Sequence, residues 1–310
     1  MLDAKTFAAV TLTLLFWSSA FSAIRIGLRA FGPGELALAR YAVASLAFLV
    51  YALATKMPMP HPADRVRLLL LGVVGIGVYH TALNFGEVSV PAGTASLIVA
   101  TTPAFTAALS HAFLKERLSA PGWFGLGVSF AGIALISAGT GEGLRVTTGG
   151  LLVLIAALAT SVFFVFHKPL SARHGSVQLT AYFSWAGTLP MLVFAPGLVR
   201  QLAAAPAQDA LAALYLGLFP SAVAYAAWAF ALSRAPTGLV TSFLNLNPAL
   251  ALTIAWGVLG ERPSLTEVVG GALAIAGVIL VNRAGKRTDA PAVLRGLASH
   301  RDSPVLGTRR

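Results

Sequence analysis

Two prolines with polar neighbours interrupt apolar stretches of this 310-residue chain. The residues of the two sites are Thr101, Thr102 and Pro103 in the first, and Asn245, Asn247 and Pro248 in the second. A proline inside a helix donates no backbone hydrogen bond and frees the carbonyl one turn earlier, here that of Val99 and that of Leu244. In hydrocarbon such a carbonyl needs a partner or a watery cavity. We therefore expect Pro103 and Pro248 to be hinges near the middle of their helices, beside which the hydroxyl and amide groups bind a small polar ligand.

A histidine and an asparagine share one face of another apolar stretch. His80 and Asn84 are about one helical turn apart, and Tyr79 lies beside them. A neutral imidazole at such a place can hydrogen-bond a ligand, and one that titrates near physiological pH can carry a proton. No acidic residue lies in the middle of an apolar stretch to pair with it, so any proton chemistry would rest on His80.

Arg40 is the one cation placed well inside an apolar stretch, shortly after Glu35. Its guanidinium would attract a carboxylate or phosphate of a ligand, or close one mouth of a cavity. Deep aromatic side chains would add a surface for an apolar, aromatic or cationic ligand. These aromatic candidates are Trp17, Trp185, Tyr225 and Trp228, with Tyr182 on the same helix face as Trp185.

Each of these groups also has a purely structural interpretation. Prolines bend helices for packing, and Asn and Thr tie neighbouring helices together. A buried histidine can be held by a neighbouring hydroxyl, and mid-span aromatic rings often only pack. The stem of Arg40 could snorkel, or its head could pair with Glu35 or a carbonyl.

The chain lacks the patterns of several enzyme classes. It has no cysteine, and no group of His, Asp and Glu has the spacing of metal ligands. It also lacks the HExxH and GxSxG patterns and paired acids inside an apolar stretch. The glycine-rich run at 72–77 follows no predicted strand, so it does not indicate a phosphate loop. We expect no catalytic residue, no metal and no cofactor.

Composition indicates an integral membrane protein. The chain is 57% hydrophobic and 11% charged, and at about 20 residues per crossing it has room for roughly ten helices. The expected spans are 7–28, 34–54, 66–85, 91–114, 121–139, 149–168, 177–199, 210–232, 236–259 and 264–282. A cleaved signal peptide ending near residues 20–23 is the alternative for the first span, but it would leave two unequal halves.

The distribution of positive charge predicts the orientation. Most of the 22 Lys and Arg residues fall on the side of the N-terminus. Because cytoplasmic loops carry the excess of positive charge, both termini are expected in the cytoplasm. The net charge of +11 is then a topology signal, and a nucleic-acid partner is not expected.

Residues 91–117 recur as residues 236–262. One shift pairs Pro91 with Pro236, Gly93 with Gly238, Pro103 with Pro248, Thr102 with Asn247, and Glu116-Arg117 with Glu261-Arg262. Residues 1–144 and 145–285 are therefore expected to be two copies of one unit, followed by a disordered basic cytoplasmic tail at 286–310. Because each copy has an odd number of spans, the second must be inverted. An all-α membrane protein of ten transmembrane helices in a 5+5 inverted repeat is predicted, and this architecture indicates alternating access.

Two further repeated features are expected to be structural. Gly125, Gly132 and Gly139 recur at a heptad spacing, and Gly270 and Gly277 repeat it in the last span. These glycines predict close packing of the fifth and tenth helices rather than a cavity wall. The two Glu-Arg pairs at helix ends could be gates, but local solvated ion pairs are the preferred interpretation.

The chain resembles the drug/metabolite transporter superfamily, in its ten-helix EamA-type branch. The resemblance rests on residues 17–27 (WSSAFSAIRIG), on Arg40-Tyr41 and on the twice-used Pro-x-Gly to Pro to Glu-Arg pattern, and it covers residues 5–285. It implies a transporter of small metabolites, often an amino-acid exporter, in the bacterial inner membrane, and amino acids are the expected cargo. Nucleobases, sugars or drugs are alternative cargoes, and a membrane enzyme or receptor is a more distant alternative.

The expected partners are a small-molecule substrate and the lipid bilayer, with the monomer as the functional unit. Since no carboxylate is expected within a span, facilitated transport or weak coupling through His80 is expected.

Overall fold

The computed structural model describes residues 3–114, 118–139, 147–235, 240 and 243–284. Every regular element in these ranges is a helix. The basic tail, Glu116, Arg117, Pro236 and Gly238 lie outside the described residues.

The first half of the chain forms five helical crossings, of which the third and fourth are each made of several pieces. Their elements are α1 (Ala4–Gly27); α2 (Pro33–Thr55); η1 (Pro62–Asp64), α3 (Arg65–Gly72), η2 (Val73–Val78) and α4 (Tyr79–Glu87); α5 (Ala92–Val99) and α6 (Thr102–Leu114); and α7 (Ala120–Gly139). The first helix begins where Asp3 accepts a hydrogen bond from the backbone N–H of Thr6, an N-cap that satisfies a free donor.

The second half repeats this order. Its elements are α8 (Thr148–His167) and η3 (Lys168–Ala172); α9 (Ser176–Met191), η4 (Leu192–Phe194) and α10 (Ala195–Ala204); α11 (Ala207–Leu218), η5 (Phe219–Val223) and α12 (Ala224–Arg234); η6 (Phe243–Leu246) and α14 (Asn247–Leu259); and α15 (Leu265–Ala284). Gly260 ends α14 at a φ of 71°, a left-handed conformation that glycine adopts without strain.

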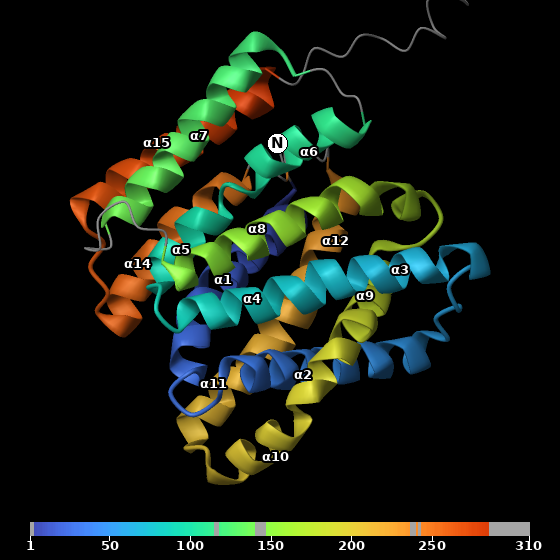
Figure 1. The fold of residues 1–310 in the computed structure, drawn as a ribbon. Coiled ribbons are helices and arrows are strands. Elements are labelled where there is room, and N and C mark those ends of the chain that lie inside the picture. The colour runs from blue at the N-terminus through green and yellow to red at the C-terminus, as the bar shows by residue number, and fades with distance from the viewer. Residues whose placement is uncertain (1–2, 115–117, 140–146, 236–239, 241–242, 285–310) are drawn as a thin grey trace, which may run out of the picture.

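Ten apolar segments account for the predicted crossings. In the described ranges, 7 segments are long and apolar enough to span a membrane, and Ala120–Ile136, Phe243–Leu259 and Leu265–Val281 are shorter apolar helices. Figure 1 shows them as a bundle from which the paired helices α7 and α15 project. The prediction of an all-α membrane protein is confirmed.

The irregular segments of the two halves coincide. The third crossing contains the π-helix η2 and the eighth contains the π-helix η5, at equivalent places between their flanking α-helices. The fourth crossing restarts at Thr102, and the ninth restarts at its repeat partner Asn247. The duplication therefore extends to the breaks in the helices.

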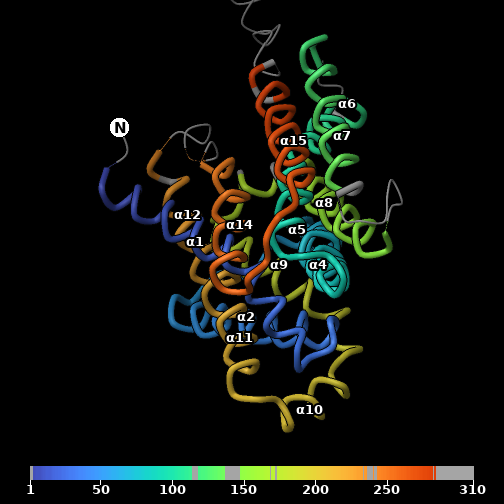
Figure 2. Tube along the Cα trace, turned by 90° about the vertical axis from the view of Figure 1, so that its left-hand side faces the viewer, coloured from blue at the N-terminus to red at the C-terminus, as the bar shows by residue number. Residues whose placement is uncertain are grey.

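The equivalent helices α7 and α15 pack antiparallel, side by side in both Figure 1 and Figure 2. A Cβ on Gly132 would lie 2.6 Å from the carbonyl oxygen of Gly270, and one on Gly277 would lie 2.5 Å from that of Gly125. Residue numbers thus rise along one helix as they fall along the other. Because the two helices are repeat partners, this contact shows that the halves are inverted, and it confirms the predicted glycine seam.

The seam predicts a sharp difference between two glycines of α7. Gly132→Ala places a methyl group against backbone atoms that cannot turn away, and we expect a loss of about 1–3 kcal/mol. A Cβ on Gly127 would meet nothing within 4 Å, so Gly127→Ala should be neutral or stabilise the helix by about 0.5–1 kcal/mol. Thermal unfolding in detergent measures both. Equal melting temperatures for the two variants would contradict the close seam.

Candidate functional site: a cavity between the two halves

A cavity of about 380 Å³ lies between the halves. Both halves contribute to its wall, through α1, α2, η2, α4, α5 and α6 from the first, and through α8, α9, α12, η6, α14 and α15 from the second. Ile275 and Val278 of α15 belong to this wall, so the expectation that the tenth helix only packs is wrong. The cavity is built around the two places where helices are broken.

The first break lies between α5 and α6. The Thr102 hydroxyl donates to the carbonyl of Val99 at 2.7 Å, which is the carbonyl that Pro103 leaves free. The Thr101 hydroxyl donates to the carbonyl of Ile98 at 2.6 Å. The protein therefore satisfies the backbone of this break with its own threonines.

Each break is also held by a serine from the other half. The Ser161 hydroxyl of α8 lies 3.0 Å from the carbonyl of Thr102 and 2.7 Å from that of Ala157 in its own helix, so it shares its proton between the two acceptors. Ser18 of α1 donates to the side-chain oxygen of Asn247 at 2.6 Å and lies 3.2 Å from its backbone carbonyl. The two serines thus make equivalent bonds, each from the first helix of one half to the break in the opposite half.

The prolines lie after the breaks rather than in the middle of continuous helices. Pro103 and Pro248 are the second residues of α6 and α14, where a missing backbone N–H removes no helical hydrogen bond. The expectation of mid-helix kinks is corrected in this respect. Both prolines line the cavity, together with Thr102, Asn245 and Asn247.

Arg40 lines the cavity and is only 3% exposed. Its Nε donates to the hydroxyl of Ser221 at 2.6 Å, and that hydroxyl in turn donates to the carbonyl of Leu216. Among the described residues Arg40 forms no ion pair, with Glu35 or with any other acid. The buried side chain does not snorkel, and among the described residues its head bonds to a hydroxyl rather than to Glu35 or a carbonyl, the partners expected. The cavity holds a buried cation whose charge no described acid compensates.

His80 also lines the cavity, next to Tyr79. Its Nε2 is hydrogen-bonded to the hydroxyl of Tyr41, as the structural interpretation of this histidine expects. Its Nδ1 is buried and has no partner among the described residues. One ring nitrogen is thus fixed by the protein, and the other is buried without a partner among the described residues.

Three aromatic rings form one wall of the cavity. Trp17 packs against Tyr225 with ring centroids 5.2 Å apart and against Trp228 at 5.3 Å. The Trp17 indole N–H donates to the carbonyl of Pro220 at 3.1 Å. Pro220 and Ser221 both lie in the π-helix η5, so this irregular turn orients both the aromatic wall and Arg40.

Three other residues predicted for the site do not line the cavity. Asn84 is fully buried and donates to the carbonyl of Pro33 at 3.2 Å. Thr101 is fully buried beside the break. Trp185 donates to the carbonyl of Ser45 at 3.0 Å and lines a separate hollow.

The sequence analysis missed two kinds of polar residue. The first kind is serine in an apolar helix, namely Ser18, Ser161 and Ser221. The only signal in the sequence that could have indicated a role for them is a hydroxyl group among apolar neighbours. Glu87 is fully buried at the end of the apolar segment Pro62–Glu87. The expectation that no carboxylate lies within a span is therefore wrong, because the third crossing extends further than the predicted 66–85.

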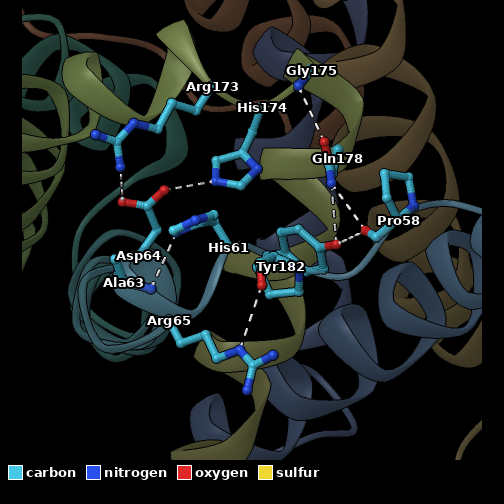
Figure 3. A network of polar contacts seen from close by, with 11 residues as sticks. Pro58, His61, Ala63, Asp64, Arg65, Arg173, His174, Gly175, Gln178 and Tyr182 are labelled. Atoms are coloured by element: carbon cyan, nitrogen blue, oxygen red, sulfur yellow. Dashed lines mark hydrogen bonds and ion pairs between the residues drawn. The ribbon is translucent and has the colours of Figure 1, made fainter.

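The cavity reaches one end of the bundle and stops short of the other. Towards the first end its wall includes Ser171, Ser176 and Thr180, and beside them Asp64 pairs with Arg173 at 3.3 Å and with His174 at 3.1 Å. Figure 3 shows this network, which ties η1 of the first half to the start of α9.

At the second end, Arg25 of α1 pairs with Glu261 at 3.4 Å. Glu261 thus bonds across the halves, which corrects the expectation of a local pair with Arg262. We call this the Arg25 end.

The model of the family described as "EamA-like transporter family" matches residues 5–138 and again 147–283. The chain belongs to this family. An EamA-like chain is a transporter rather than an enzyme, so the chemistry of its cavity is that of binding and release. The double match also accounts for the repeat of helices, π-segments and breaks.

Two relatives support this assignment, and one solved structure shows the same fold. The chain is 40% identical to a "Probable terminal-alkyne amino-acid exporter" of Streptantibioticus cattleyicolor, over 92% of this chain and 97% of that protein. It is 39% identical to the "Uncharacterized transporter YdfC" of Bacillus subtilis, over 86% and 88%. A structure titled "Crystal structure of protein" has a TM-score of 0.61 at 20% identity, covering 94% of this chain and 100% of that one, and shows the same fold.

The serine bonds to the breaks of this EamA-like chain can be tested within one helix. Ser18→Ala removes the bond to Asn247, and we expect a loss of about 0.5–1.5 kcal/mol, the net value of one hydrogen bond, because the half-buried Asn247 lines the cavity. Ser22 is also buried on α1, but its hydroxyl has no partner among the described residues, so Ser22→Ala should be neutral or stabilising. Thermal unfolding in detergent compares them. A Ser22→Ala variant as unstable as Ser18→Ala would contradict the role of the cross-half bond.

Proposed function

We propose that this protein exports amino acids, or closely related compounds with a carboxylate, by alternating access, and that Arg40 binds the carboxylate. The observation that carries the proposal is the buried Arg40 in the cavity wall, with no acidic partner among the described residues. A desolvated cation without a counter-charge is unfavourable, and a substrate carboxylate would compensate it. The guanidinium fork can bond a carboxylate with two parallel N–H groups.

The remaining wall suits the rest of an amino acid. Trp17, Tyr225 and Trp228 present apolar ring surface for a side chain, and an aromatic ring also attracts an ammonium group. The Thr102 hydroxyl and the Asn247 side-chain oxygen are already hydrogen-bonded at the breaks. We therefore propose Asn245 for direct polar contact, with His80 beside it in the cavity wall. A cavity of about 380 Å³ suits a small ligand.

The name of one relative agrees with this chemistry. That relative is named a probable exporter of a terminal-alkyne amino acid, a compound with a carboxylate and a slim apolar side chain. We propose the same class of cargo here, with nucleobases, sugars or drugs as the competing outcomes of a transport assay.

The two halves would act as rocking units. We propose residues 1–144 and 145–285 as these units in a bacterial inner membrane, with both termini in the cytoplasm, the basic tail at 286–310 beside the membrane and the monomer as the functional unit. With this orientation the end near Ser176 is cytoplasmic, so the cavity extends towards the cytoplasm, and Pro103 and Pro248 mark hinges at its centre.

Counterflow of labelled compounds in proteoliposomes tests the proposal. We expect the wild-type protein to exchange apolar amino acids, and Arg40→Gln to weaken their binding by about 10- to 100-fold, the range for a lost hydrogen bond to a charged group. Arg40→Lys should restore part of the loss, because it keeps the charge but not the fork.

Two comparisons separate recognition from folding. The first uses the amine that corresponds to each amino acid but lacks its carboxylate, which should bind equally to wild type and to Arg40→Gln. The second uses Arg29→Gln, at an exposed position, which should behave as wild type. Equal losses for the amino acid and its amine, or exchange of nucleobases or sugars instead, would refute the carboxylate site.

A further inference from the structure

We propose that Glu87 is a proton-binding site, and that its proton keeps the Arg25 end of the cavity sealed. The proposal rests on the transport cycle proposed above, but it concerns a different ligand, the proton, and a different part of the chain.

The first observation is the environment of the Glu87 carboxyl group. Glu87 is fully buried, and neither of its carboxyl oxygens has a hydrogen-bond partner among the described residues. Glu267 is also buried, but Thr94 donates to one of its oxygens, and the backbone N–H and hydroxyl of Ser264 donate to the other at 2.7 and 2.9 Å. A carboxylate with three donors is stable as an anion, whereas one without donors in an apolar site favours the neutral acid. The surroundings of Glu87 therefore favour its neutral, protonated form, which the proposal assigns to this conformation.

The second observation is that Arg25 joins Glu87 to the other half. The Arg25 guanidinium donates to the backbone carbonyls of Glu87 and Val88, at 2.5 and 3.1 Å, and its Nε pairs with Glu261 at 3.4 Å. One Glu261 oxygen is buried without a partner among the described residues. Arg25 is thus bonded to backbone of the first half and to a carboxylate of the second.

The third observation is the position of this cluster relative to the cavity. Ile24 and Leu83 line the cavity, Arg25 follows Ile24, and Glu87 lies about one helical turn beyond Leu83. The cluster of Arg25, Glu87 and Glu261 therefore lies between the cavity and the end of the bundle that is closed.

The charged groups that act on Glu87 are Arg25 of α1, Arg40 of α2 and Glu261 after α14. On its own helix, Tyr79 and His80 are the other titratable groups. The packed helix α5 has none, and the only one on α8 is His167 at its last turn. The packed helix α2 also carries Glu35 and Tyr41. Among the cations of the closed end, Arg25 is the one bonded to the backbone of Glu87.

These contacts define a switch in which Arg25 pairs either with Glu261 of the second half or with Glu87 of the first half. When Glu87 is neutral, Arg25 bonds to Glu261 and ties the halves together. When Glu87 loses its proton to water at this mouth, the new anion competes with Glu261 for Arg25. Pairing within the first half then weakens the bond between the halves, and the mouth can open. A proton taken up from the same side restores the seal.

The absence of cysteine in the chain allows a direct test. Ala20→Cys places a thiol in the cavity wall, and Ala203→Cys places one at an exposed position of α10, near the Arg25 end, where Gln201 bonds to the backbone of Gly32. A membrane-impermeant thiosulfonate is applied to that face of reconstituted vesicles. The Ala203→Cys rate corrects for the effect of pH on the reagent.

We expect the corrected labelling of Ala20→Cys to rise with pH, by up to about tenfold per pH unit, the limit for one proton. Adding Glu87→Gln, which mimics the neutral acid, should hold labelling low at every pH. Adding Glu261→Gln should raise it at every pH, because Arg25 loses its partner across the halves. Glu267→Gln, the matched buried acid, should leave the pH dependence intact.

Other outcomes overturn the proposal. They are labelling of Ala20→Cys that does not change with pH, pH dependence that survives Glu87→Gln, or pH dependence that disappears with His80→Ala instead. Thermal unfolding in detergent shows that each variant is folded, because a variant locked in one state would lose counterflow without losing its structure. Wild-type protein without amino-acid counterflow but with pH-dependent labelling would refute the proposed cargo and leave the proton site standing.

Discussion

The structure depends on how two broken helices are satisfied inside an apolar bundle. A chain in hydrocarbon must pair every backbone polar group, so a helix can break only where other groups replace the lost bonds. Here Thr102 bonds the carbonyl that Pro103 leaves free, and Ser161 and Ser18 each reach across to the break in the opposite half. The cavity can exist because these bonds satisfy the breaks without filling the space between the halves. Through the same bonds, each half stabilises the helix break in the opposite half.

The two halves share one fold because of the duplication, but unlike residues at equivalent places give the cavity wall its chemistry. Equivalent glycines show which residues correspond, because a Cβ on Gly72 would meet the backbone of Phe183 and one on Gly217 would meet that of Arg40. Arg40 and Phe183 both line the cavity, so a cation in one half corresponds to an aromatic ring at the equivalent place in the other half. The shift of the repeat likewise pairs His80 with Tyr225. An inverted pair of halves can alternate symmetrically while its pocket binds an asymmetric molecule in one orientation.

The sequence was sufficient for the frame and for the centre of the cavity. Apolar length predicts crossings, the repeat predicts inversion, and Pro103 and Pro248 predict the breaks, because these features depend on local chemistry and on the solvent alone. The partners could not be predicted. A serine in an apolar helix can always bond to its own backbone, so nothing in the spacing indicates that Ser18 reaches Asn247 or that Ser221 holds Arg40. The burial of Glu87 was also hidden, since hydropathy indicates the length of a span but not its tilt or rotation.

The chain keeps a buried cation and a buried acid unpaired, although pairing them would be the simpler way to stabilise both. Arg40 faces the cavity, and Glu87 lies in the seal beyond it, and no ion pair joins them. If Arg40 and Glu87 formed an ion pair, each would balance the charge of the other, and neither a substrate carboxylate nor a proton would be needed. In the mechanism that we propose, each is balanced by a ligand that can leave, a substrate carboxylate at Arg40 and a proton at Glu87. A transporter requires this arrangement, because a charge neutralised permanently by the protein cannot respond to what the protein carries.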